Sequence, residues 1–201
     1  RMRLGIPGMF SVYNALSVIA CACALGVSLD DCAAALDTAK PVKGRAEVLE
    51  TDGDYAILID YAVTPDAIDN ILTTVREFAP ARLVFLFGCG GDRDKTKRPE
   101  MADAACRYSD HVILTSDNPR SEDPEQIIRD MLTGVKEGFQ YRVEAITDRK
   151  EAIRKAIGMA SKGDIILVAG KGHENYQEVK GVKHHFDDKE VIREIFDLSN
   201  R

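Results

Sequence analysis

Several patterns that would assign a function at once are missing from this sequence. No apolar run approaches the length of a membrane span, and no leader pattern opens the chain, so we expect neither a membrane partner nor a secretory signal. The cysteines contain no CxxC pair and form no metal-ligand spacing with the histidines. We therefore expect no metal site and reduced thiols in a cytoplasmic protein. The five thiols are Cys21, Cys23, Cys32, Cys89 and Cys106.

The common nucleotide and hydrolase motifs are missing as well. Gly170-Lys171-Gly172 lacks the earlier glycine and the following hydroxyl of a GxxxxGK[ST] phosphate loop. The run 88–91 is not continued as GxGxxG, and no GxSxG is present, which argues against a serine hydrolase. A net charge of -6 argues against nucleic acid as the main partner. We expect this chain to complete a nucleotide site, not to form one alone.

The hydrophobic pattern predicts an α/β fold. A helical hairpin comes first, followed by repeated strand–helix units whose strands are apolar and β-branched. Such units favour a mostly parallel, doubly wound, Rossmann-like sheet with helices on both faces. The expected helices span residues 12–25, 29–39, 65–78, 99–108, 124–134, 149–160 and 189–198, and the expected strands 55–60, 82–87, 111–115, 142–146, 164–169, 176–179 and 182–186.

Four polar loops follow strands of this predicted sheet. They are residues 60–66, 88–98, 117–120 and 170–174. Open parallel sheets bind ligands at the carboxyl ends of their strands, so we expect these loops to meet in one site. In the loop 88–98, glycines would allow a close approach to an anion, and Arg93, Lys95, Lys97 and Arg98 supply positive charge. Each loop alone also fits a plain turn, a helix cap or a solvated basic segment.

A succession of short motifs resembles the Mur ligase family. The motifs are GxFxVYN (8–14), GR-x-E (44–47), DYAxTPD (60–66), FGCGGDRDxxKRP (87–99), TSDNPR (115–120), DR-x-x-AI (148–153) and AGKGHExYQ (169–177). They occur in the family's order over nearly the whole chain. The resemblance implies that residues 1–40 are the helical end of a central ATPase domain, 41–46 a linker, and 47–201 a C-terminal, amino-acid-binding, Rossmann-like domain.

The resemblance also implies a reaction. Family enzymes are cytoplasmic and phosphorylate a peptide carboxylate with ATP and Mg²⁺, and an amino acid then attacks the acyl phosphate to form an amide. The diaminopimelate-adding type extends UDP-N-acetylmuramoyl-L-alanyl-D-glutamate in peptidoglycan synthesis. The present chain would supply the amino-acid site only, with no catalytic residue of its own. We expect it to be inactive alone and to bind neither ATP nor Mg²⁺ strongly.

Individual positions carry the implied roles. Those implied to hold the amino acid are Arg98, Asp117, Asn118, Pro119, Arg120, Gly170 and Glu174, and those implied to face the nucleotide are Asn14, Arg45 and Asp60. A diamino diacid needs a guanidinium for its remote carboxylate and an acid for its remote ammonium, and Arg120 with Glu174 supplies both.

One departure leaves alternatives open. Val63 stands where the family usually has histidine, in a loop expected near ATP, so nucleotide binding is in doubt. Besides the diaminopimelate ligase we therefore keep two alternatives: a ligase for L-lysine or another amino acid, and a non-catalytic paralogue that acts as a binding module.

Overall fold

The computed structural model describes residues 2–4, 8–40, 42–49, 51, 53–79 and 81–199. Pro41 of the predicted linker and the chain ends Arg1 and Arg201 lie outside these residues. The chain divides into two compact units, residues 1–42 and 43–201.

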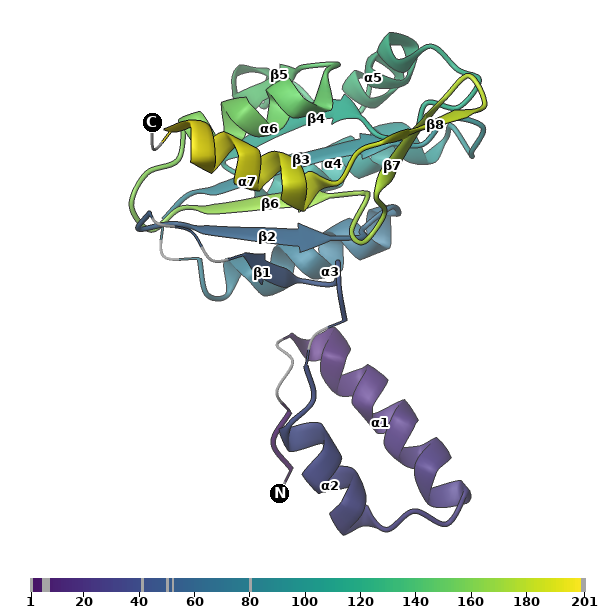
Figure 1. Cartoon of the computed structure of the whole chain (residues 1–201). Coiled ribbons are helices and arrows are strands. Elements are labelled where there is room, and N and C mark those ends of the chain that lie inside the picture. The colour runs from purple at the N-terminus through teal and green to yellow at the C-terminus, as the bar shows by residue number, and fades with distance from the viewer. Residues whose placement is uncertain are drawn as a thin grey trace. The chain divides into compact units, whose positions relative to one another are not determined.

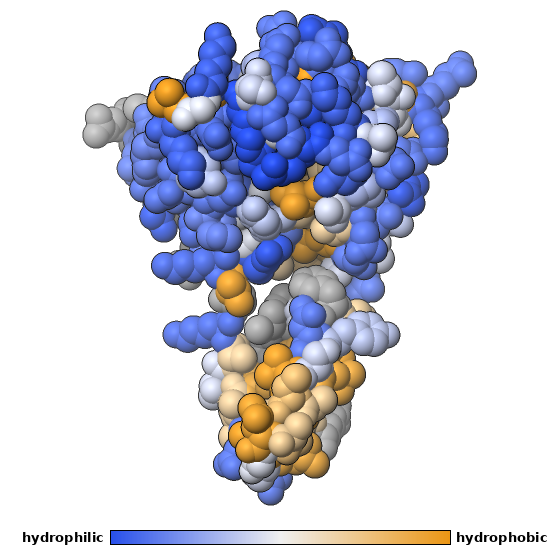
Figure 2. Space-filling view, turned by 90° about the vertical axis from the view of Figure 1, so that its right-hand side faces the viewer, coloured by the Kyte–Doolittle hydropathy of each residue, from blue (hydrophilic) through white to orange (hydrophobic). Residues whose placement is uncertain are grey.

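The first unit is a pair of helices, α1 (Met9–Ala24) and α2 (Leu29–Asp37). Ser28 caps α2, because its hydroxyl accepts a hydrogen bond of 3.1 Å from the amide of Asp31. Large apolar side chains are exposed along the unit, and Figure 2 shows them gathered on its surface. They include Met9, Val12, Leu16, Val18, Leu25 and Leu29.

The second unit is built on a six-stranded sheet in the order β1-β2-β6-β3-β4-β5. All neighbours are parallel except β1, which pairs antiparallel with β2 at the edge. The strands are β1 (Glu47–Leu49), β2 (Ala56–Asp60), β3 (Leu83–Cys89), β4 (His111–Ser116), β5 (Val143–Ala145) and β6 (Ile165–Ala169). A separate antiparallel hairpin joins β7 (Tyr176–Val179) to β8 (Val182–His185).

Helices cover both faces of the sheet (Figure 1). On one face, α6 (Arg149–Gly158) and α7 (Asp188–Ser199) bury Ile153, Ala156 and Ile192 against strand residues such as Ile59 and Leu86. The other face carries α3 (Pro65–Arg76), α4 (Lys97–Tyr108) and α5 (Pro124–Leu132), which contact one another in that order. The predicted α/β class, with a mostly parallel sheet between helices, is confirmed.

Most element boundaries lie within two residues of those predicted. Thr64 caps α3 as its position before Pro65 suggests. β1 was not predicted, because it has only three residues and its valine, Val48, is exposed, so the segment shows no alternation of buried apolar and exposed polar residues. α4 begins at Lys97, two residues before the proline expected to start it. Because the helix begins earlier, the side chain of Arg98 is directed into the interior of the protein.

Candidate functional site

The loops after β3 and β4 are packed against each other without a gap. A side chain at Gly88 would overlap with the carbonyl oxygen of Thr115, and one at Gly91 would overlap with that of Pro119. The amide of Gly91 also donates to the carbonyl oxygen of Asn118 at 2.9 Å. Two of the three glycines thus serve close packing of backbones, not the approach to an anion that the sequence suggested. Gly90 does face the cavity described next.

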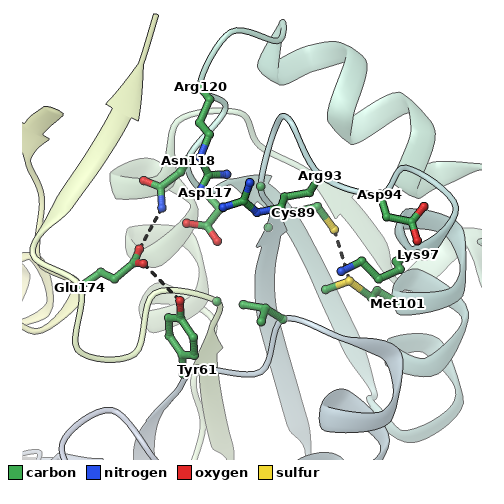
Figure 3. Close-up of a pocket in the computed structure, with 14 residues that line it drawn as sticks. Tyr61, Cys89, Arg93, Asp94, Lys97, Met101, Asp117, Asn118, Arg120 and Glu174 are labelled. Atoms are coloured by element: carbon green, nitrogen blue, oxygen red, sulfur yellow. Dashed lines mark hydrogen bonds between the residues drawn. The ribbon is translucent and has the colours of Figure 1, made fainter. Parts of the chain in front are cut away.

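A cavity of about 150 Å³ lies where the loops after β2, β3, β4 and β6 meet (Figure 3). All four loops predicted to form one site contribute to it. Its lining combines apolar groups with three cationic and three anionic side chains. The lining residues are Tyr61, Val63, Gly88, Cys89, Gly90, Arg93, Asp94, Lys97, Met101, Asp117, Asn118, Arg120, Gly170 and Glu174.

Arg120 is held in place from two sides. Its guanidinium donates to the carbonyl oxygen of Gly91 at 2.7 Å and lies 3.7 Å from the Glu178 carboxylate. Its backbone amide donates to the carbonyl oxygen of Glu178 at 2.9 Å, which joins the loop to β7. Arg120 also has φ 51°, a conformation that costs a non-glycine residue free energy and persists where the surroundings impose it. The side chain is therefore positioned before any ligand arrives.

Glu174 and Asn118 form the opposite, acidic side of the cavity. The Asn118 amide nitrogen donates to Glu174 Oε2 at 2.8 Å, and the Tyr61 hydroxyl donates to Glu174 Oε1 at 3.3 Å (Figure 3). Burial and the Glu174 carboxylate raise the pKa of Tyr61, so its proton stays available for this bond. Both oxygens of Glu174 accept hydrogen bonds from neutral donors, and its ion pair with the buried Lys171 is long, at 3.8 Å, so the carboxylate is oriented towards the cavity without being neutralised by a short ion pair.

Asp117 and Gly170 line the base of the cavity. Asp117 is 5% exposed, and burial raises the pKa of its carboxyl group against the opposing effects of Arg149 and Lys171. Gly170 has φ 106°, and a side chain there would crowd the Asp117 carboxylate. Pro119 lies in the same loop but is absent from the lining; its carbonyl oxygen accepts a hydrogen bond of 3.0 Å from Glu122.

Arg98, which the resemblance assigns to the amino acid, is not among the residues that line the cavity. Its side chain is 1% exposed and pairs with Glu122 at 2.8 Å and Asp130 at 2.7 Å. Arg93 and Lys97, from the same basic loop, line the cavity instead. The spacing of these basic residues in the sequence does not show which of them line the cavity and which are buried. The position at which α4 begins decides this, because it places Arg98 inside the protein.

None of the three residues implied to face a nucleotide is among the lining residues. Asp60 is 7% exposed and accepts a hydrogen bond of 2.8 Å from the amide of Ala46. Burial raises its pKa. Arg45 is exposed, and its guanidinium lies 4.9 Å from the centre of the Tyr61 ring. Asn14 is an exposed residue of α1, in the other unit.

Cys89 and Val63 also belong to the cavity wall. Cys89 is 6% exposed, and burial raises the pKa of its thiol to about 12, so it is a protonated filler residue and not a nucleophile. Val63, expected near ATP, lines the same cavity as Arg120 and Glu174.

Comparisons with known proteins agree with this architecture. The family described as "Mur ligase, glutamate ligase domain" matches residues 44–172. The UDP-N-acetylmuramoyl-L-alanyl-D-glutamate–2,6-diaminopimelate ligase of Phocaeicola vulgatus is 51% identical over 191 residues, which is 94% of this chain and 40% of that protein. The protein of the same name from Geobacillus thermodenitrificans is 52% identical over 188 residues, 94% of this chain and 38% of its own length. A solved structure of a protein of that name superimposes with a TM-score of 0.76 at 41% identity and covers 100% of this chain and 41% of that one.

The fold is an α/β domain with a mostly parallel sheet and a polar cavity at the carboxyl ends of its strands. The chain belongs to the Mur ligase family. It spans about two fifths of the length of the curated relatives that it matches. None of the helices that the structure describes is long and apolar enough to cross a membrane.

Proposed function

We propose that this chain is the amino-acid-binding part of an ATP-dependent ligase that adds meso-diaminopimelate to UDP-N-acetylmuramoyl-L-alanyl-D-glutamate in the cytoplasm. One observation carries the proposal: a preset guanidinium, Arg120, and a carboxylate without a short ion pair, Glu174, line the same small cavity. A diamino diacid has a carboxylate and an ammonium at each end. One end therefore fits between these two side chains, and the other is left for reaction.

The cation content of the lining favours a ligand with two carboxylates. Arg93 and Lys97 line the cavity in addition to Arg120. L-Lysine has a single carboxylate, so its distal end would bring no anion to Arg120, which would keep only the Glu178 carboxylate at 3.7 Å. The diacid adds a charge-assisted contact to the guanidinium in a partly desolvated site, and this gain favours the diacid.

The reaction assigns the chain a binding role. ATP with Mg²⁺, when bound to the whole protein, would supply the phosphoryl group that activates the acceptor carboxylate. The residues of this chain would orient the incoming amino acid so that its free amine reaches the acyl phosphate. Arg45 is exposed and fits contact with a nucleotide, whereas Asp60 is occupied by Ala46 and fits a role in shaping the Arg45 segment.

The remaining assignments are part of the same proposal. Residues 1–40 would be the helical end of a central ATPase domain, whose contact would cover the exposed apolar side chains of α1 and α2. Residues 41–46 would be the linker, and residues 47–201 the amino-acid-binding domain. Pro119 would act through the backbone of its loop, and Arg98 by supporting that loop through Glu122.

The test is competition between the two amino acids in the full-length protein. Amide formation from the UDP-muramyl dipeptide should favour meso-diaminopimelate over L-lysine, and Arg120→Ala should remove most of that preference, by roughly 30-fold or more. Arg129→Ala, an exposed arginine on α5, is the matched control and should leave selectivity unchanged. A wild-type preference for lysine, or a preference that survives Arg120→Ala, would contradict the proposal. Absence of any amide product would favour the binding-module alternative.

A further inference from the structure

Lys171 is a buried cation that does not line the cavity. It follows β6 directly, and its side chain is 0% exposed. Its ammonium group donates to the carbonyl oxygen of Tyr176 at 2.5 Å and to Asn118 Oδ1 at 3.1 Å, and it lies 3.3 Å from Asp117 Oδ1. Three N–H donors thus face three oxygen atoms. A fully buried lysine is rare and needs such compensation.

Lys171 fixes which way the Asn118 amide points. An ammonium group can only donate hydrogen bonds, so the side of the amide facing it must be the oxygen. The amide of Glu178 donates to the same oxygen at 3.0 Å. The nitrogen of Asn118 is therefore directed at Glu174, where it holds Oε2. The orientation of the cavity carboxylate depends on a lysine behind it.

Lys171 also sets the charge of the cluster. Three carboxylates, Asp117, Glu174 and Asp188, lie among two cations, Lys171 and Arg149. With all five groups ionised, the cluster carries one net negative charge. Asp188 is paired with Arg149 at 2.7 Å, whereas Lys171 lies between two carboxylates, 3.3 Å from Asp117 and 3.8 Å from Glu174, so its single charge does not compensate both.

We propose that Lys171 is a positioning residue of the amino-acid site: by pairing with Asp117 and orienting Asn118, it holds the Glu174 carboxylate where it can receive the ammonium group of the ligand. Only the identity of that ligand rests on the proposed function. The balance of buried charges holds for any cationic ligand.

The first test is thermal unfolding of the full-length protein as a function of pH. Lys171→Met keeps the length of the side chain and removes its charge. Asp117 then loses a compensating cation, so its carboxyl pKa rises further above its unfolded value. Because a raised carboxyl pKa makes stability fall as pH rises, the melting temperature of Lys171→Met should drop further below wild type between pH 5 and pH 8. The other ionisable groups near the pair, Glu174, Asp188, Arg149, Tyr61 and Tyr176, are unchanged.

The second test adds Asp117→Asn to Lys171→Met. Removing both partners restores the cluster to one net negative charge, so the double variant should regain stability and lose the extra pH dependence. A melting deficit that is the same at every pH, or a double variant no better than the single one, would overturn the proposal. If Lys171→Met does not fold, folding of the double variant becomes the test. A charge pair between Lys171 and Asp117 predicts that the double variant folds although the single variant does not.

The third test separates this inference from the proposed function. Lys171→Met should raise KM for the amino acid roughly tenfold to a hundredfold with little change in KM for ATP. Equal effects on both Michaelis constants would overturn the positioning role. If the wild-type protein forms no amide, the proposed function fails, and the two melting tests still decide the inference.

Discussion

Arg149 and Asp188 form a bidentate ion pair buried beneath the candidate site, with Nε–Oδ1 at 2.8 Å and Nη2–Oδ2 at 2.7 Å. The two residues begin α6 and α7, and they are 39 positions apart in the chain. Arg149 also donates to the carbonyl oxygen of Ala169 at 2.9 Å, at the end of β6. One guanidinium thus joins two helix starts to the strand that leads into Gly170 and Lys171.

Removing one partner of this pair should be strongly destabilising. Arg149→Met would leave the Asp188 carboxylate buried without its bidentate partner, and we expect a loss of about 3–5 kcal/mol. Arg154→Met is the control on the same helix, because that arginine is exposed and its ion pair with Glu151 should contribute less than about 1 kcal/mol. Chemical denaturation of the full-length protein measures both. Equal losses in the two variants would show that burial of the Arg149 pair adds nothing.

Three arginines show how far sequence could predict this site. Arg93, Arg98 and Arg149 all lie in motifs that resemble the family, and the resemblance assigned only Arg98 to the substrate. Their actual places depend on partners far along the chain: Glu122 is 24 residues from Arg98, and Asp188 is 39 residues from Arg149. Local pattern carries no signal for such pairs.

The elements themselves were predicted well, because their signals are local. Ser28, Thr64 and Asp148 each accept a hydrogen bond from the first turn of the helix that follows them, and the strand residues 83–87 are apolar without interruption. The convergence of the four loops on one cavity also follows from a general property of parallel sheets. That general property does not predict which side chains of each loop face the cavity, because packing between the loops decides this.

The Glu122–Arg98 pair should make stability sensitive to acid. Arg98 lowers the pKa of Glu122 to about 2, below the ordinary value of 4.5. A lowered carboxyl pKa stabilises the fold above about pH 4.5, and this contribution is lost as the pH falls towards about 2. Glu122→Gln should therefore reduce the melting temperature at pH 7 and have little effect near pH 2. Glu137→Gln, at an exposed glutamate, is the control. A Glu122→Gln deficit that grows as the pH falls would contradict this assignment.

Val63 should affect the amino acid and not the nucleotide. The sequence suggested a place near ATP, but the side chain lines the cavity together with Cys89 and Met101, where it forms part of an apolar wall beside the charged groups. Such a wall fits the methylene chain between the two ends of a diamino diacid. Val63→Ala removes two carbon atoms from it, which at about 0.8 kcal/mol for each fully buried methylene should raise KM for the amino acid roughly fivefold for a half-buried residue. KM for ATP should stay within about twofold, since no nucleotide contact is lost.

Val63→His restores the residue usual in the family and should likewise leave KM for ATP unchanged. Steady-state kinetics of the full-length protein with each substrate varied in turn measures both constants. Tighter ATP binding by Val63→His, with no change in KM for the amino acid, would contradict this prediction and show that position 63 contacts the nucleotide.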